Sequence, residues 1–149
     1  ITGCVAVEGR CAQAERAVAR GKRIEARIPQ VFLDSPISFA GYLYGTAVGW
    51  VWGSLWSTGR VERRAGLWVF RGMPEATFGR GGVCVGGCFL TGDGRIDDRL
   101  LRHEAVHREQ WRRYGMLMPF LYLLAGRNPL TNRFEIEAGL ADGRYVPRD

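Results

Sequence analysis

The chain has 149 residues, of which 46% are hydrophobic and 24% charged, and 21 basic against 15 acidic residues give a net charge of +6. This composition excludes a disordered or fibrous protein and predicts one globular domain over residues 1–149. The basic residues are spread along the chain without a run of five like charges, so we expect no nucleic-acid partner.

Residues 1–34 are interpreted as an N-terminal extension, and residues 1–30 show no apolar core of a signal peptide. The alanine-rich segment Ala12–Arg20 predicts a helix that ends at Gly21. Polar and apolar residues alternate over Lys22–Pro29, which predicts a short strand. The localisation stays open between the cytoplasm and a membrane.

The segment Ser35–Gly59 contains 25 residues without a charge. Asp34 or Ser35 can cap a helix here with Pro36 as its first residue, and glycines recur at every fourth position from Gly41. Tryptophans at its end, followed by arginines, are typical of a membrane span. We favour a helix buried under a sheet, because the glycines dilute the hydrophobicity and burial also explains the absence of charge. Membrane association through residues 35–59 is the alternative.

Two strands are expected next, at Leu67–Arg71 and Val83–Thr91. In the second strand Cys84 and Cys88 would lie on one face roughly 13 Å apart, too far for a mutual disulfide. We expect two buried thiols, and we disfavour a zinc site of four cysteines because paired C-x2-C knuckles are missing. An extended peptide could pair with the second strand at the edge of the sheet. Turns are expected at Gly81-Gly82 and Gly92-Asp93-Gly94.

The next segment has the signals of a complete helix, from a cap at Asp97 to a left-handed stop at Gly115. It contains H-E-x-x-H, made by His103, Glu104 and His107, and these are the only histidines of the chain. Positions four apart lie one turn above each other, so both imidazoles can share one metal ion at about 2.0–2.1 Å. Glu104 is rotated about 100° from His103, where it can act as a base towards a metal-bound water. The pattern favours a metal site over a pair of surface histidines.

A tetrahedral catalytic site needs a third protein ligand, and without a further histidine this is an acid or, less readily, a cysteine. A helix is predicted over residues 128–143, and its Glu135 and Glu137 lie about 200° apart, so only one faces the metal. We prefer Glu135, which shares its face with small residues that let a second helix approach, and Glu137 is the alternative. If the helix starts late, Glu135 would instead form a capping box with Asn132.

The H-E-x-x-H motif, followed by Arg133-Phe134-Glu135-Ile136-Glu137-Ala138, resembles the gluzincin group of zinc metallopeptidases, most of all the HtpX/Ste24-like peptidase cores. The resemblance covers about residues 67–143 and implies a zincin-like α+β fold, with a small sheet, an active-site helix and a second ligand-bearing helix. It implies one Zn²⁺ on His103, His107 and Glu135, Glu104 as catalytic base, and a peptide or protein substrate. Gly139 departs from the family, which has an acid there to support a histidine ligand, and Asp142 is our candidate for that support.

Three functions follow from these residues. The first is a zinc-dependent metallopeptidase that hydrolyses peptide bonds by Glu-assisted attack of a metal-bound water. The second is an inactive zincin-fold binding or scaffold module, and the third is a membrane-associated accessory protein. The substrate, the cysteine redox state and the oligomeric state are not predicted. Candidates for stabilising the oxyanion are Tyr114, Tyr122 and Tyr145.

Overall fold

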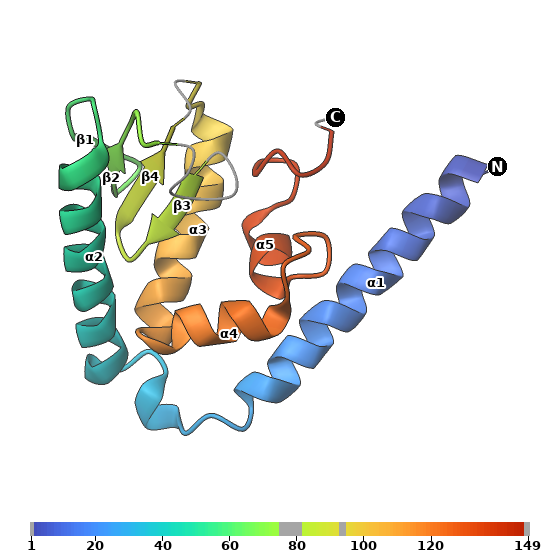
Figure 1. Ribbon diagram of the computed structural model, residues 1–149. Helices are drawn as coiled ribbons and strands as arrows, with labels where there is room; N and C mark the ends of the chain where they lie inside the picture. The colour runs from blue at the N-terminus through green and yellow to red at the C-terminus, as the bar shows by residue number, and fades with distance from the viewer. Residues whose placement is uncertain (1, 75–81, 93–94, 148–149) are drawn as a thin grey trace.

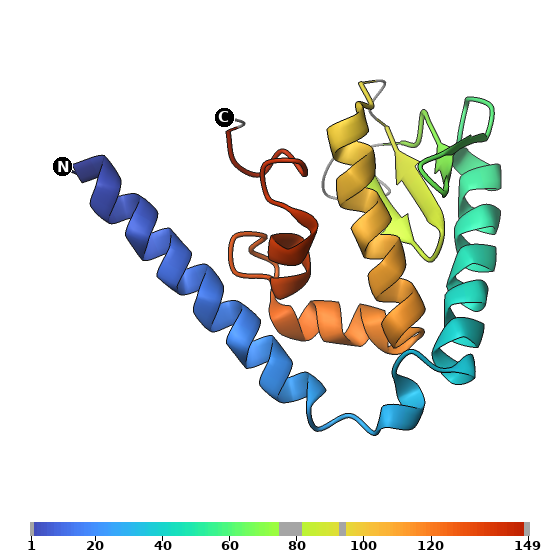
Figure 2. The same cartoon turned by 180° about the vertical axis from the view of Figure 1, so that it is seen from behind.

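The computed structural model describes residues 2–74, 82–92 and 95–147, with side chains from residue 8 onward. Within them the predicted α+β class is confirmed, and a mixed sheet of four strands lies between two helices (Figures 1 and 2). The elements in chain order are α1 (Thr2–Glu25), a 3-10 turn (Gln30–Phe32), α2 (Pro36–Trp56), β1 (Glu62–Arg64), β2 (Leu67–Phe70), β3 (Gly82–Val85), β4 (Cys88–Thr91), α3 (Asp98–Tyr114), α4 (Leu117–Ala125) and α5 (Arg133–Ala138).

Helix α1 corrects two predictions. It continues through Gly21 to Glu25, so the stop at Gly21 and the strand at Lys22–Pro29 are both wrong. Glu25 accepts hydrogen bonds from the Tyr114 hydroxyl at 2.8 Å and from Arg133 Nη2 at 2.9 Å. Gly21 is needed where α1 passes the Arg133 side chain, because a Cβ there would collide with it. Tertiary contacts therefore extend the helix beyond a residue that favours its end.

Helix α2 begins as predicted, with Ser35 as the N-cap in a capping box with Ser38 and Pro36 as the first helical residue. Its glycines face inward: a Cβ at Gly49 would lie 2.8 Å from the Cβ of Cys88. The opposite face is exposed, so the prediction of a buried helix holds only for the glycine face. Among the described helices none is both long and apolar enough to cross a membrane.

The strand predicted at Val83–Thr91 is two strands. The chain turns at Gly86-Gly87, so that β3 and β4 form an antiparallel hairpin with Cys84 opposite Phe89. Gly86 has a φ of +59°, and a Cβ on it would collide with the backbone of Thr46. The first predicted strand is confirmed as β2, which pairs in parallel with β4. Of the predicted turns, Gly81 and Asp93-Gly94 lie outside the described residues.

The sheet has the order β1-β2-β4-β3 in the part of the chain that is described, which makes β3 an edge. One face packs on α2 through Phe70, Cys88 and Leu90, and the other packs on α3 through Val69 and Phe89. Cys84 and Cys88 are both free thiols, but only Cys88 is buried as expected, since Cys84 is half-buried, and the two lie on neighbouring strands and not on one. Burial raises the pKa of the Cys88 thiol to about 12, so it stays protonated.

Candidate metal centre

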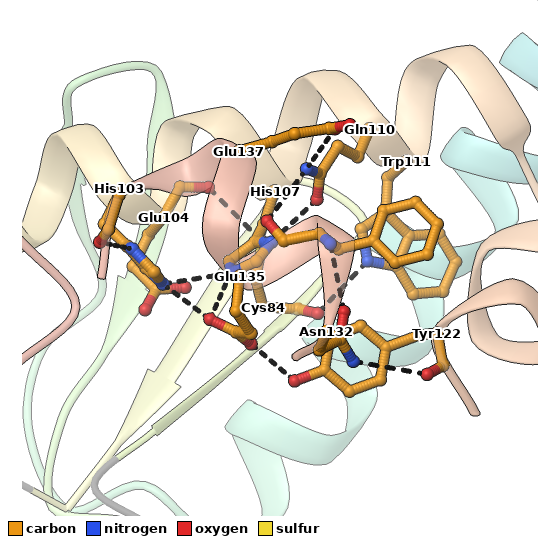
Figure 3. A network of polar contacts seen from close by, with 12 residues as sticks. Cys84, His103, Glu104, His107, Gln110, Trp111, Tyr122, Asn132, Glu135 and Glu137 are labelled. Atoms are coloured by element: carbon orange, nitrogen blue, oxygen red, sulfur yellow. Dashed lines mark hydrogen bonds and ion pairs between the residues drawn. The ribbon is translucent and has the colours of Figure 1, made fainter. Parts of the chain in front are cut away.

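Helix α3 carries the H-E-x-x-H motif, and its predicted ends are confirmed. The Asp97 side chain caps it by accepting a hydrogen bond from Leu100 N at 2.9 Å, and Gly115 ends it with a φ of +57°. One side of α3 packs on the sheet, while His103 and His107 point to the side where α5 lies (Figure 3). Because one side of α3 packs on the sheet and the two histidines lie one turn apart on another side, the helix presents both imidazoles to α5.

Helix α5 is much shorter than the helix predicted over residues 128–143. It covers only Arg133–Ala138, because the Asn128 side chain accepts from Leu130 N at 3.0 Å and forms a turn in place of a helix start. Asn132 caps α5 by accepting from Phe134 N at 3.0 Å. The alternative capping box is not formed, since the Glu135 carboxylate contacts the two histidines.

Three ligand-type atoms meet between α3 and α5. His103 Nε2 lies 3.0 Å from Glu135 Oε2 and 3.0 Å from His107 Nε2, and His107 Nε2 lies 3.4 Å from the same Oε2. A tetrahedral Zn²⁺ site with bonds of about 2.05 Å separates its ligand atoms by roughly 3.3 Å. The spacing of the three atoms is therefore that of one face of such a site (Figure 3).

The tautomers of both histidines follow from their other ring nitrogens. His103 Nδ1 lies 2.8 Å from the carbonyl oxygen of Gly139, which can only accept, so Nδ1 carries the proton. His107 Nδ1 lies 2.8 Å from Gln110 Oε1, and this amide orientation is fixed because Gln110 Nε2 donates to Phe134 O at 3.1 Å. In the neutral imidazoles both Nε2 atoms are therefore lone-pair donors, as a metal requires.

The charges of the cluster also favour a cation. Glu135 Oε2 is buried and has no hydrogen-bond partner among the described residues. Burial raises the pKa of Glu135, but the close approach of the His103 and His107 rings to its carboxylate outweighs this effect and holds the pKa well below its ordinary value. Burial lowers the pKa of His107, but Glu135 and Glu104 raise it to about 9. Three electron-pair donors face one another, so the cluster needs either an extra proton or a metal ion.

Glu104 lies beside this cluster and not in it. Burial raises the pKa of its carboxyl group, both histidines lower it, and the charge of Glu135 raises it further. Glu104 and His107 are each 7% exposed, whereas His103 is 1% and Glu135 3% exposed. Glu104 is therefore a buried, weakened acid next to the ligand atoms.

The structure separates Glu135 from the alternative ligand, Glu137. Glu137 is exposed and lies near Gln110 Nε2 at 3.5 Å and Arg133 Nε at 3.6 Å, outside the group of ligand-type atoms. A cysteine as the third ligand has no support either, because no cysteine side chain in the described residues belongs to the cluster. The nearest thiol, Cys84, lies 3.7 Å from the Glu104 carbonyl oxygen.

Support for the histidines comes from groups that the sequence did not indicate. Asp142, the candidate for this role, instead pairs with Arg99 at 2.6 Å. The Gly139 carbonyl oxygen supports His103, so the glycine that replaces the expected acid supplies its backbone instead. Gln110 supports His107, and a spacing of three residues after the second histidine, H-E-x-x-H-x-x-Q, is the signal that could have identified it.

The three tyrosines differ in position. The Tyr122 hydroxyl donates a hydrogen bond to Glu135 Oε1, and the Tyr145 ring lies 6.0 Å from the His103 ring. Tyr114 contacts Glu25 and Arg133 at the junction with α1, so it is excluded as a group that touches this site. Of the predicted oxyanion candidates, Tyr122 and Tyr145 remain.

Comparison of the chain with protein-family models, with curated proteins and with solved structures finds no match in any of the three. The fold and site define an α+β protein with a buried His-His-Glu cluster and a neighbouring glutamate. The assignment of a function therefore depends on the chemistry of these side chains.

Proposed function

We propose that the chain is a zinc-dependent metallopeptidase with a reduced zincin-like fold, in which His103, His107 and Glu135 hold one Zn²⁺. The observation that carries the proposal is the convergence of three buried ligand-type atoms, His103 Nε2, His107 Nε2 and Glu135 Oε2, within 3.4 Å of one another. Their spacing suits the tetrahedral geometry and the nitrogen and oxygen ligands that zinc prefers. Three protein ligands leave a fourth position open, which is typical of a catalytic site.

A Zn²⁺ ion bound there supplies a Lewis acid that polarises a carbonyl group and lowers the pKa of water. Glu104 is the general base, which takes a proton from the attacking water on its carboxylate and passes it to the leaving amine. Its raised pKa suits this role, because a carboxyl group that titrates nearer to neutral pH can both accept and return a proton. Tyr145 is the candidate donor for the developing oxyanion, because the single hydroxyl proton of Tyr122 is already donated to Glu135 Oε1.

The substrate class is a peptide, because β3 lies at an edge of the sheet formed by the described strands and can pair with an extended chain. Strand β3 offers few backbone groups to such a chain, because it has only four residues. One of them is already used, since the indole Nε1–H of Trp111 donates to the Cys84 carbonyl oxygen at 3.1 Å. An extended substrate would therefore make only a few backbone hydrogen bonds with this edge.

The first test is the metal content of the untagged protein by mass spectrometry. We expect one zinc per chain in the wild type and in Glu137→Ala, and loss of zinc in His107→Ala and Glu135→Ala. A peptide library is then tested with the wild type and with Glu104→Gln, which should keep its zinc and lose at least a hundredfold in rate. A folded wild type that cannot be loaded with zinc contradicts the metal site. Zinc binding without Glu104-dependent cleavage contradicts the peptidase and favours the scaffold module.

A further inference from the structure

Helix α2 has its large side chains on the outside. The residues that it buries against the sheet and α3 are Ser38 and four glycines. On the opposite side, Leu43, Val51 and Leu55 are 51%, 62% and 66% exposed. The other large hydrophobic side chains exposed on this helix are Ile37, Phe39, Tyr44, Val48 and Trp56. These eight residues define the apolar face of α2, which runs along the outer side of the molecule (Figures 1 and 2).

The apolar face is continuous along α2, and continuous exposed apolar faces mark interaction sites or membrane contacts. With 21 residues, α2 is about 31 Å long, and large apolar side chains are exposed from its first turn to its last. Within this fully described helix, the exposed residues with side-chain hydrogen-bonding groups are Tyr44, Ser54 and Trp56. A specific protein interface of this length uses a polar rim and several hydrogen bonds, whereas lipid hydrocarbon requires neither.

Arginines accompany the apolar face at both ends. Arg112 of α3 lies over the ring of Phe39 at 5.8 Å, and exposed Arg60 and Arg63 follow the end of α2. No acidic residue occurs between positions 35 and 61. This combination of a charge-free apolar face and flanking arginines is complementary to anionic lipid headgroups. Acidic groups on neighbouring elements are paired with arginines: Asp34 with Arg113, Glu62 with Arg71, and Glu109 with Arg108 and Arg112.

From these observations we propose that the apolar face of α2 docks on the surface of an anionic membrane. The helix lies in the plane of the interface, with its apolar side chains about 5–10 Å below the headgroups and the arginines among the phosphates. In this arrangement α2 does not cross the membrane, and its glycine face stays packed against the sheet and α3. The inference does not depend on the metal site or on the peptidase activity.

The test is flotation of the full chain with vesicles of phosphatidylcholine, alone or mixed equally with phosphatidylglycerol. We expect binding to the mixed vesicles and a blue shift of the tryptophan emission, because Trp56 is exposed on the apolar face. Leu43→Glu with Val51→Glu should weaken binding at least tenfold without unfolding the chain, since both side chains are exposed. Arg60→Gln with Arg63→Gln should weaken it by roughly five-fold for each arginine.

The matched control is Phe120→Glu with Leu123→Glu on α4, which replaces two apolar residues that are 65% and 72% exposed. This variant should bind vesicles like the wild type. Equal loss of binding in both double variants contradicts docking through α2. If the wild type does not float and light scattering gives a dimer that Leu43→Glu and Val51→Glu separate, the apolar face binds a second copy and the proposal is wrong. A monomer that does not float also overturns it, whatever its zinc content.

Discussion

Replacement of Gln110 by alanine tests whether this side chain supports a metal ligand of the proposed site. Gln110 is buried, accepts from His107 Nδ1 at 2.8 Å and donates to Phe134 O at 3.1 Å, next to Glu135. One side chain thus fixes the ring of a ligand on α3 and the backbone beside a ligand on α5. Loss of such support lowers zinc affinity by about 10- to 100-fold, or about 1.4–2.7 kcal/mol. The substitution leaves His107 Nδ1 and the Phe134 carbonyl oxygen without their partner, which should also destabilise the metal-free protein by about 2 kcal/mol or more.

The assay is a zinc titration against a competing chelator, together with urea unfolding of the metal-free protein. Gln110→Glu separates the two effects, because a carboxylate still accepts from His107 Nδ1 but cannot donate to Phe134 O and lies close to Glu137. We expect this variant to keep its zinc affinity within a few-fold while it loses stability. The control, Glu109→Ala, removes an exposed neighbour and should change neither quantity. Wild-type zinc affinity in Gln110→Ala would refute the inferred tautomer and its role.

Two further predictions concern the same cluster. In Gly143→Ala the new Cβ would lie 2.5 Å from His103 Cε1, so we expect reduced zinc occupancy by mass spectrometry. The control is Gly9→Ala on α1, where a Cβ meets no atom within 4 Å and the zinc should be kept. Full zinc occupancy in Gly143→Ala would mean that the approach of residues 139–143 to His103 is wrong. The pKa of His107 is raised from 6.5 to about 9 in the folded protein, so this group stabilises the metal-free fold below pH 6.5, and the contribution is lost as the pH rises to 9. Urea unfolding in chelator should show this decline, zinc should remove it, and a flat profile without zinc would contradict the pairing of His107 with Glu135.

Helix α3 could be predicted almost to the residue because its signals are local. A capping aspartate, a left-handed glycine and two histidines one turn apart each act within a few residues of the chain. Helical geometry also predicted that only one of Glu135 and Glu137 faces the histidines, because angular separation holds within two turns. The choice of Glu135 rested on the small residues of its face, and of these only Ala138 lies in the six-residue helix, so that argument depended on a helix that was predicted too long.

The elements that were predicted wrongly are those that distant contacts determine. Glu25 holds the end of α1 through Tyr114 and Arg133, and no local pattern indicates such partners. The alternation from Val83 to Thr91 continues through Gly86-Gly87, because a two-residue turn keeps the apolar pattern on both strands of a hairpin. The hydrogen bond from His103 to the Gly139 carbonyl oxygen could not be predicted either, since every residue has a backbone carbonyl group and the residue type does not indicate which one accepts.

The close packing of the glycine face of α2 could be predicted, but the exposure of its opposite face could not, because both faces are uncharged. Large side chains would normally be assigned to the core, but a Cβ at Gly45 would lie 2.9 Å from the Trp111 ring, so only a glycine permits this close approach. Close packing against α3 therefore decided which face is buried. The apolar side chains were left outside as a consequence.

Helix α3 consequently has two neighbours with different roles. In the fold α3 lies between α2 and α5 (Figure 2). It packs against the glycines of α2 through Trp111 and Gly115, and it faces α5 with the two histidines. Since a helix is about 10 Å across, α2 and α3 together separate the apolar face of α2 from the histidine cluster by more than one helix diameter. If both proposals hold, the metal site of a docked molecule faces away from the bilayer, and its substrate is a peptide segment in water beside the membrane and not one within the hydrocarbon.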